Sequence, residues 1–422
     1  MAHHEHEVRA PKAFEVPAKF RTACLAMAVL GFAGFGVGLF VDYYAAWNGY
    51  LIGFWFTLSL GLAGAFLNAT QYLAIAGWSV SVRRIGEAMA QYVPVAAVLF
   101  IGLIFGGEKL YHWWDPAYVQ ADSILQKKAA VLDSTVFSAA CIISLAAMSA
   151  LIFKIRSLSL KMDSSSDPSI YPKQKTISAV FLIVYVIGFA ILSWYCLMSL
   201  EPHWFSTMWS VYMFAGMFQS GLALTILIML WLMDRDYFGD FVSTKQVHDL
   251  GQFMFAFTVF YMYIAFSQFL LIWYANIPEE AMFYVTRGTP PDVTTGWEVI
   301  TWSIPVLKFL VPFFILLPQE HKKNKYNILR YTAVGLVIMQ LVEVWWIVAP
   351  TPHEKGALAA APSMPIFELL TTMGFMGVFG FVVATQLAKA NLVPTKDPFL
   401  AESIEHHHHG VRPPRPENIV IS

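Results

Sequence analysis

Ten long apolar stretches divide this 422-residue chain, and each is long enough to cross a bilayer as a helix. Apolar runs of about 20 residues predict transmembrane helices, because a helix satisfies its own backbone hydrogen bonds inside lipid. Only 13% of the residues are charged, against roughly 25% in a typical soluble domain. We therefore predict an all-α polytopic membrane protein, with ten transmembrane helices at 20–41, 49–77, 85–106, 131–153, 177–200, 206–233, 247–276, 297–318, 328–349 and 364–387.

The basic residues predict how the chain is oriented in the membrane. With both termini cytoplasmic, 21 of the 27 Lys and Arg residues fall in cytoplasmic segments, 5 fall in outer loops and Lys308 falls inside a span. Multi-pass proteins carry this excess of positive charge on the cytoplasmic side. We expect a cytoplasmic segment at 1–19, a membrane domain at 20–387 and an extended cytoplasmic tail at 388–422.

A faint internal repeat indicates how the spans are grouped. The sequences GAFLN at 64–68 and GMFQS at 216–220 lie 152 residues apart, a separation of four predicted spans. An even number of spans keeps two repeated units parallel, so spans 2–5 and 6–9 are expected to form two parallel four-helix bundles with flanking helices. Close helix packing at a small residue is the simpler interpretation of either glycine.

Seven titratable residues in or near the spans are candidates for a proton path, because an ionisable group inside a bilayer is costly and indicates function by default. By linear position, from the cytoplasmic side outward, they are Glu87, His248, Asp249, Lys308, Glu343, Glu368 and Asp133. The polar residues expected to support them are Asn68, Gln71, Gln91, Gln252 and Gln340.

Several of these residues also have a purely structural interpretation. Glu87 follows Arg83 by four residues, which favours an ion pair on one helix surface. Asp133 fits the N-cap of a helix or an interfacial position. His248 lies where a hydrogen-bonding histidine that does not respond to pH is common.

Lys308 is the most central of the candidates. It lies between Pro305 and Pro312, which leave backbone carbonyls unpaired and can kink or open the helix. The same lysine can neutralise Glu343 or Glu368 in a buried structural pair, and one pair can serve both purposes. A proton-transfer role and a structural role therefore both remain open for Lys308.

Other activities lack the residues that they need. None of the 12 histidines lies in the middle of a span, which argues against a bound haem b. The sequence has no phosphate-binding G-x-x-x-x-G-K-[ST] loop and no C-x-x-C pair among its three cysteines. The histidine run at 406–409 is not expected to form a functional metal site, and a net charge of −1 argues against nucleic-acid binding.

Three stretches of the chain resemble one family of membrane subunits. They are HDLGQFMFAFTVFYMYIAFSQFLLIWYANIPEE at 248–280, SLEPHWFSTMWSVYMFAGMF at 199–218 and AGWSVSVRRIGEAM at 76–89. These segments are similar to the NrfD/polysulfide-reductase-type integral membrane subunits, and more closely to the second, shorter subunit of this type in bacterial alternative complex III, a quinol:cytochrome c oxidoreductase. The resemblance extends over residues 20–387.

This resemblance implies a location in the bacterial cytoplasmic membrane, two parallel four-helix bundles plus two helices, and no cofactor or catalysis in this chain. It implies three kinds of partner besides lipids: a larger homologous NrfD-like subunit, an iron–sulfur subunit and c-type cytochrome subunits that carry haem c. The family implies either a transmembrane proton path with energy coupling, or a quinone/quinol site for which Asp133, Glu368 and the pair Trp113/Trp114 are available. We expect the proton path, because the polar residues spread across the depth of the membrane. A secondary transporter is the alternative from another class, and a plain membrane anchor is a third.

Overall fold

The computed structural model describes the chain except for residues 1–8, 166, 290–293, 324–325, 352–361 and 406–422. The described residues form helices and loops, with no strand among them. Ten helical segments are long and apolar enough to cross a membrane. The chain is therefore all-helical and multi-pass, as predicted; the histidine run 406–409 lies outside the described residues.

The ten membrane-spanning segments follow one another along the chain with mostly short connections. They are α1 (Ala18–Val41), α2 (Tyr43–Leu73), η1 with α3 and α4 (Gly77–Val82, Arg83–Ala90 and Val93–Leu110), α7 (Ser134–Ser164), α8 (Ile170–Cys196), α9 (Trp209–Met233), α10 (Thr244–Ala275), α12 with η4 and α13 (Glu298–Ile304, Pro305–Leu310 and Val311–Leu316), α15 (Tyr326–Val348) and α16 (Ile366–Ala388).

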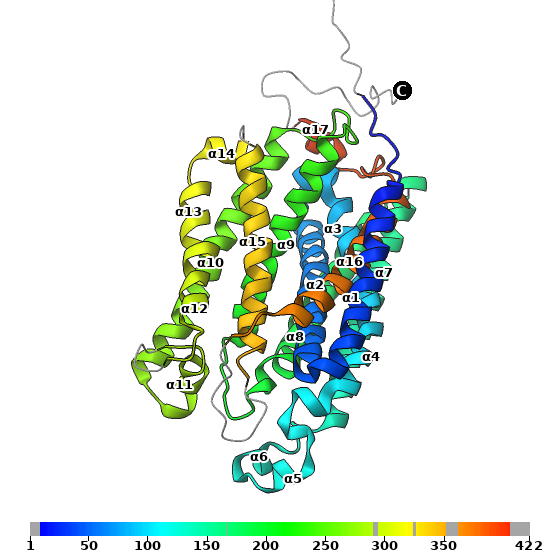
Figure 1. Cartoon of the computed structure of the whole chain (residues 1–422). Coiled ribbons are helices and arrows are strands. Elements are labelled where there is room, and N and C mark those ends of the chain that lie inside the picture. The colour runs from blue at the N-terminus through cyan, green and yellow to red at the C-terminus, as the bar shows by residue number, and fades with distance from the viewer. Residues whose placement is uncertain (1–8, 166, 290–293, 324–325, 352–361, 406–422) are drawn as a thin grey trace, which may run out of the picture.

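Short helices occupy the loops at both ends of the molecule. At one end lie α5 (Pro116–Gln120), α6 (Ser123–Lys128) and α11 (Pro278–Val285), and at the other lie α14 (Gln319–Lys323) and α17 (Leu400–Glu405) (Figure 1). We refer to these as the α11 end and the α17 end.

Helix α2 lies at the centre of the molecule and is buried along almost its whole length (Figure 1). It contacts α1, α3, α4, α8, α9, α15 and α16. Small residues permit this crowding: a Cβ atom on Gly64 would lie 2.6 Å from the carbonyl oxygen of Gly86 on α3, and one on Gly221 of α9 would lie 2.0 Å from the Cβ of Ala63. Close packing therefore accounts for Gly64 of the repeated motif.

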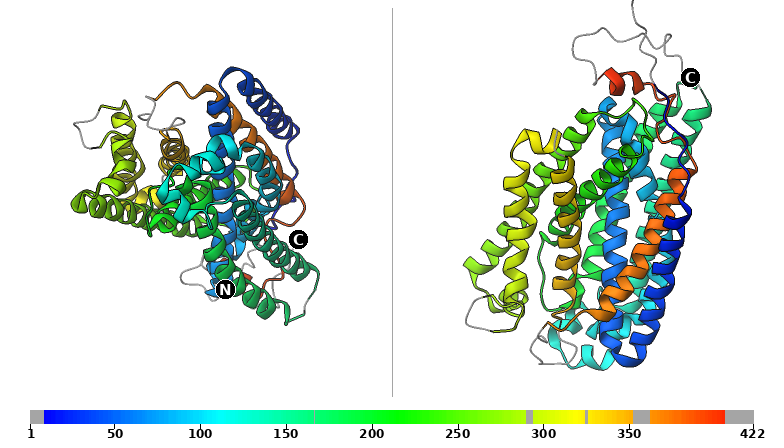
Figure 2. Two further views of the ribbon diagram at one scale, coloured as in Figure 1. Left: turned by 90° about the horizontal axis from the view of Figure 1, so that it is seen from below. Right: turned by 45° about the horizontal axis from the view of Figure 1, so that its top comes forward.

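The other helices pack in neighbouring pairs around α2 and α9. Helices α1 and α16 run side by side along one edge (Figure 2), α7 packs on α4 and α8, and α9 packs on α10 and α15. The α12–η4–α13 segment contacts α10 and α15. Its π-helical turn spans Pro305–Leu310, and the prolines at 305 and 312 supply no amide hydrogen to an ordinary α-helical ladder, so the distortion expected around Lys308 is present.

The described parts of both chain termini fold back on the α17 end. Near the N-terminus, Arg9 pairs with Asp240 at 2.8 Å and Lys12 pairs with Asp236 at 2.8 Å, which ties this segment to the loop between α9 and α10. The expectation of an extended C-terminal tail is wrong for residues 400–405, which form α17. This helix packs on η1, because the Ser403 hydroxyl donates to the Trp78 carbonyl at 3.0 Å.

Candidate functional site

A buried lysine on the distorted span forms the centre of the site. Lys308 lies on η4 and is completely buried, as is Glu343 on α15. The Lys308 ammonium donates to a carboxylate oxygen of Glu343, and to Oε1 of Gln340 at 2.7 Å. Lys308 therefore pairs with Glu343 and not with Glu368, and Gln340, three residues before Glu343 on α15, supports the pair as expected.

Two tyrosines complete this site, and nothing in the sequence distinguishes them from the other tyrosines. The phenols of Tyr212 on α9 and Tyr261 on α10 both donate to Oε1 of Glu343, the former at 2.5 Å. The Lys308 ammonium also lies 4.0 Å from the centre of the Tyr261 ring, where a cation interacts favourably with the aromatic face. We call Lys308, Gln340, Glu343, Tyr212 and Tyr261 the Lys308 cluster.

A glycine and a glutamine on α9 make the Lys308 cluster possible. A Cβ atom on Gly216 would lie 2.9 Å from Oε1 of Gln340 and 3.1 Å from both Oε2 of Glu343 and Nζ of Lys308, so the absent side chain provides the space for the pair. Pro312 has no amide hydrogen for the Lys308 carbonyl four residues earlier. The Gln219 amide donates to that carbonyl at 3.1 Å instead.

The Lys308 cluster holds one positive and one negative charge, and the loss of either charge would be costly. One ammonium and one carboxylate are fully removed from water, and each also has neutral hydrogen-bond partners. Removal of one member of such a pair leaves an uncompensated buried charge, which costs about 3–5 kcal/mol. The arrangement therefore holds two titratable groups in direct contact at a point where a change of protonation state has a large energetic effect.

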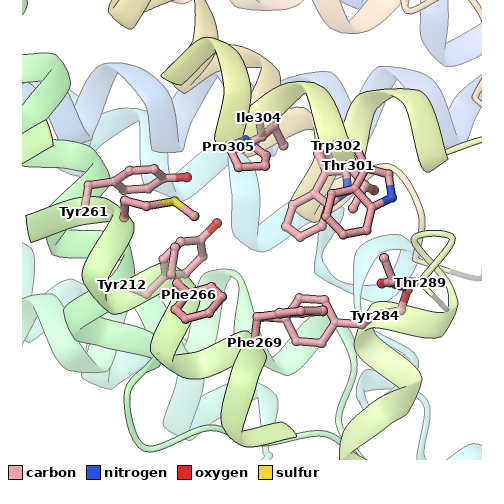
Figure 3. A pocket seen from close by; sticks show the side chains of 13 residues that line it. Tyr212, Tyr261, Phe266, Phe269, Tyr284, Thr289, Thr301, Trp302, Ile304 and Pro305 are labelled. Atoms are coloured by element: carbon pink, nitrogen blue, oxygen red, sulfur yellow. Dashed lines mark hydrogen bonds between the residues drawn. The ribbon is translucent and has the colours of Figure 1, made fainter. Parts of the chain in front are cut away.

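A pocket of about 260 Å³ adjoins the Lys308 cluster. Figure 3 shows Tyr212 and Tyr261 at one side of it and Tyr284 and Thr289 at the other. The lining residues are Tyr212, Tyr261, Met262, Ala265, Phe266, Phe269, Tyr284, Thr289, Thr301, Trp302, Ile304, Pro305 and Trp346.

The pocket lies between α10 and α12 and opens toward the lipid-facing surface. Phe266 is 50% exposed and Trp302 is 56% exposed, so its rim is formed by side chains at the outside of the helices. Burial raises the pKa of Tyr284 to about 12, and its phenol therefore stays protonated at neutral pH. The pocket is thus an apolar, aromatic space with phenol groups at both of its sides.

Arg287 fixes the wall of this pocket at the α11 end, and sequence reasoning missed it too. Its guanidinium donates to the carbonyls of Trp346 at 3.1 Å and Ile347 at 2.7 Å, and to Glu201 at 2.8 Å. It also lies over the Phe283 ring, 3.7 Å from the ring centre. These contacts join the segment after α11 to the last turn of α15.

A second buried ionic cluster lies between α3 and α7. The carboxylate of Glu87 accepts from Arg84 at 3.1 Å, Arg156 at 2.6 Å, Ser159 at 2.6 Å and Tyr72 at 3.0 Å. Arg84 also donates to Asp163 at 2.6 Å. We call these six residues the Glu87 cluster.

The expected pair between Glu87 and Arg83 is wrong. Arg83 instead donates to Asp397 at 2.8 Å and lies over the Tyr72 ring. Residues four apart are able to pair on a helix, but here Arg156 from another helix satisfies the carboxylate and the C-terminal segment satisfies Arg83.

The remaining predicted residues lie apart from both clusters or only beside them. Asn68 and Gln91 line a small cavity next to Glu87, and Gln71 is buried on α2. His248 and Asp249 are half-buried and Gln252 is exposed, all near the start of α10 at the α17 end. Glu368 is buried in the first turn of α16 at the α11 end.

Asp133 is an N-cap, which was one of its two structural interpretations. Its carboxylate accepts from the backbone amides of Thr135 at 2.8 Å and Val136 at 3.1 Å. These hydrogen bonds to the carboxylate lower its pKa below the usual value. Within the described residues, no hydrogen bond or ion pair joins the Lys308 cluster to the Glu87 cluster.

The sequence matches no protein-family model, and a search of the curated proteins found no match.

Proposed function

We propose that the chain is a membrane subunit of a quinol-oxidising respiratory complex of the alternative complex III type. The ten membrane-compatible helices and the similarity of residues 199–280 to NrfD-type subunits support this proposal. In it the chain contributes no cofactor or catalysis of its own and binds a larger NrfD-like subunit, an iron–sulfur subunit and c-type cytochromes in the bacterial cytoplasmic membrane.

The proposed arrangement in the membrane follows from charge and packing. The excess of Lys and Arg at the α17 end assigns that end to the cytoplasm, so both termini are cytoplasmic. The contacts of α2, α4, α7 and α8 with one another, and those of α9, α10, α13 and α15, support two parallel four-helix bundles, with α1 and α16 as flanking helices. The α11 end then faces the outer redox partners.

Within this complex, we assign to the Lys308 cluster the transfer of protons coupled to quinol oxidation. The observation that carries this assignment is the fully buried contact between Lys308 and Glu343, with Tyr212 and Tyr261 on the same carboxylate. Protonation of Glu343 removes the negative charge opposite Lys308, so a single proton changes the stability of the whole cluster. Protonation of Glu343 can therefore drive a conformational change of the π-helical segment that carries Lys308.

The test is proton movement by the intact complex in liposomes. We expect Glu343→Gln to lower the number of protons translocated per quinol oxidised while electron transfer continues. Glu298→Gln is the matched control, because Glu298 begins the span that carries Lys308 but contacts loop residues outside the cluster. An unchanged proton stoichiometry in Glu343→Gln would refute the assignment.

Quinol binding in the aromatic pocket is the second candidate function. The observation that favours it is that Tyr212 and Tyr261 both line the pocket and donate to Glu343, which places a proton-accepting group directly behind the pocket wall. Ala265→Trp fills the pocket and should abolish labelling of the chain by a photoreactive quinone. Ala256→Trp places the same side chain on an exposed position of α10 and should leave labelling intact. Equal labelling of the two variants would exclude this pocket as the quinone site.

A further inference from the structure

A small cavity lies inside the helices near the Glu87 cluster, away from the Lys308 cluster. It measures about 10 Å³ and is lined by buried residues on or next to α2, α3 and α7. Its polar lining residues are Asn68, Glu87, Gln91 and Arg156, and Ile152 and Ile155 form part of its apolar wall. A cavity of about 10–15 Å³ on this measure is large enough for one water molecule.

Three hydrogen-bond donors on residues that line this cavity have no partner among the described residues. They are Nδ2 of Asn68, Nε2 of Gln91 and Nε of Arg156, and their side chains belong to residues that are only 3%, 6% and 6% exposed. Buried polar groups in folded proteins are almost always paired, because an unpaired buried donor loses its bond to water without replacement. Three such donors around one cavity indicate that something in it accepts hydrogen bonds.

The charges around the cavity select a neutral occupant. Arg84 and Arg156 are balanced by Glu87 and Asp163, all within one hydrogen-bonded network. No net positive charge therefore remains to hold an anion, although the unpaired donors alone would suit one. The Glu87 carboxylate already accepts four hydrogen bonds, so the occupant is held by the hydrogen bonds that it accepts.

We propose that this cavity is a specific binding site for one internal water molecule. The water accepts from the amides of Asn68 and Gln91, so it supplies these two side chains with the hydrogen-bond partner that no described residue gives them. The network between α3 and α7 already reaches α2 through Tyr72, and the water adds Asn68 of α2 to the same junction. This site is independent of the Lys308 cluster and of the function proposed above.

X-ray hydroxyl-radical footprinting of the intact, detergent-solubilised protein tests the site directly, because radiolysis of a bound water oxidises the side chains that touch it. Ile152 and Ile155 should be oxidised several-fold faster than Ile226, which is buried without lining this cavity. Ala90→Val fills the cavity and should reduce that labelling to the rate of Ile226. Equal labelling of the three isoleucines in the parent protein would overturn the proposal.

Two further measurements distinguish the nature of the occupant. Gln91→Met removes one unpaired donor, so it lowers the unfolding midpoint if a water is bound, and it leaves the midpoint unchanged or raises it if the cavity is dry. In crystals soaked in bromide, an anomalous peak between Asn68 and Arg156 would identify an anion site and overturn the assignment to water. Absence of such a peak with retained labelling of Ile152 supports the water.

Discussion

The buried Lys308–Glu343 pair makes a quantitative prediction that distinguishes a coupled pair from two independent polar residues. The changes are Lys308→Met and Glu343→Gln, made separately and together. Each single change leaves one charge fully buried with neutral partners alone, and it should cost about 3–5 kcal/mol of unfolding free energy. Lys308→Met should be the milder of the two, because the Glu343 carboxylate keeps its two phenol donors, Tyr212 and Tyr261.

The double variant should be more stable than either single variant. It contains no buried charge, and replacement of a buried ion pair by neutral residues of similar volume is often close to neutral in free energy. Independent effects would instead add to about 6–10 kcal/mol, so the coupling between Lys308 and Glu343 is worth several kcal/mol. Reversible unfolding in mixed detergent micelles measures all four proteins. A double variant that is destabilised by the sum of the single effects would refute this reasoning.

Three other predictions concern helix packing at a glycine, a buried ion pair and the N-cap of a helix. Gly216→Ala places a methyl group against the Lys308 cluster and should cost about 1–3 kcal/mol of unfolding free energy. Gly335→Ala on α15 places its methyl group where no atom lies within 4 Å, so it should stabilise the protein by up to about 1 kcal/mol. Unfolding in micelles compares the two variants, and equal effects would contradict the packing argument. Asp397→Ala leaves the buried Arg83 without its carboxylate partner, so this change should cost about 3–5 kcal/mol of unfolding free energy. It should also make the segment after α16 cleavable in limited proteolysis. An uncleaved segment would show that this ion pair does not hold the segment in place. The pKa of Asp133 is lowered in the folded state, so its carboxylate stabilises the fold above the unfolded-state pKa. This contribution is lost as the pH falls through the folded-state pKa. The parent should therefore melt at a higher temperature than Asp133→Asn at neutral pH, and the two melting temperatures should converge in acid.

The helices were predictable because their length and apolar composition are local properties of the sequence. The distortions within helices were less predictable. The prolines predicted a distortion near Lys308, but they did not predict that it is a π-helical turn in which the Lys308 carbonyl accepts a hydrogen bond from Gln219. The short helix α17 was missed because its stability comes from contact with η1, through Ser403, and not from its own six residues.

The candidate site was only partly predictable for a related reason. A charge inside an apolar run is conspicuous, so Lys308 and Glu343 were identified, and Gln340, expected as a supporting polar residue, lies beside them. Tyr212 and Tyr261 were not identified, because they are two of 18 tyrosines in a chain rich in aromatic residues. Their role depends on which helices are neighbours, and spacing along one helix does not contain that information.

The same dependence on distant segments applies to Glu87. Sequence separation favoured a partner four residues away, yet Arg156 reaches it from α7 and Arg83 turns to Asp397. Positive charge near the end of a span was interpreted as an orientation signal, which concealed that Arg84 and Arg156 are buried. A basic residue can serve both purposes, and only the tertiary packing distinguishes them.

The central position of α2 has a consequence for how the chain is made. This helix is synthesised before α9, α15 and α16, which help to enclose it and whose residues follow it by more than a hundred positions. While these later helices are still being made, the glycine-lined surface of α2 faces lipid or a chaperone in their place. The last of these enclosing helices ends at Ala388, so the native surroundings of α2 exist only after α16 has been synthesised. A ribosome that stops before α16 would therefore release a protein in which one side of its innermost helix is uncovered, which makes that side a natural recognition point for membrane quality control.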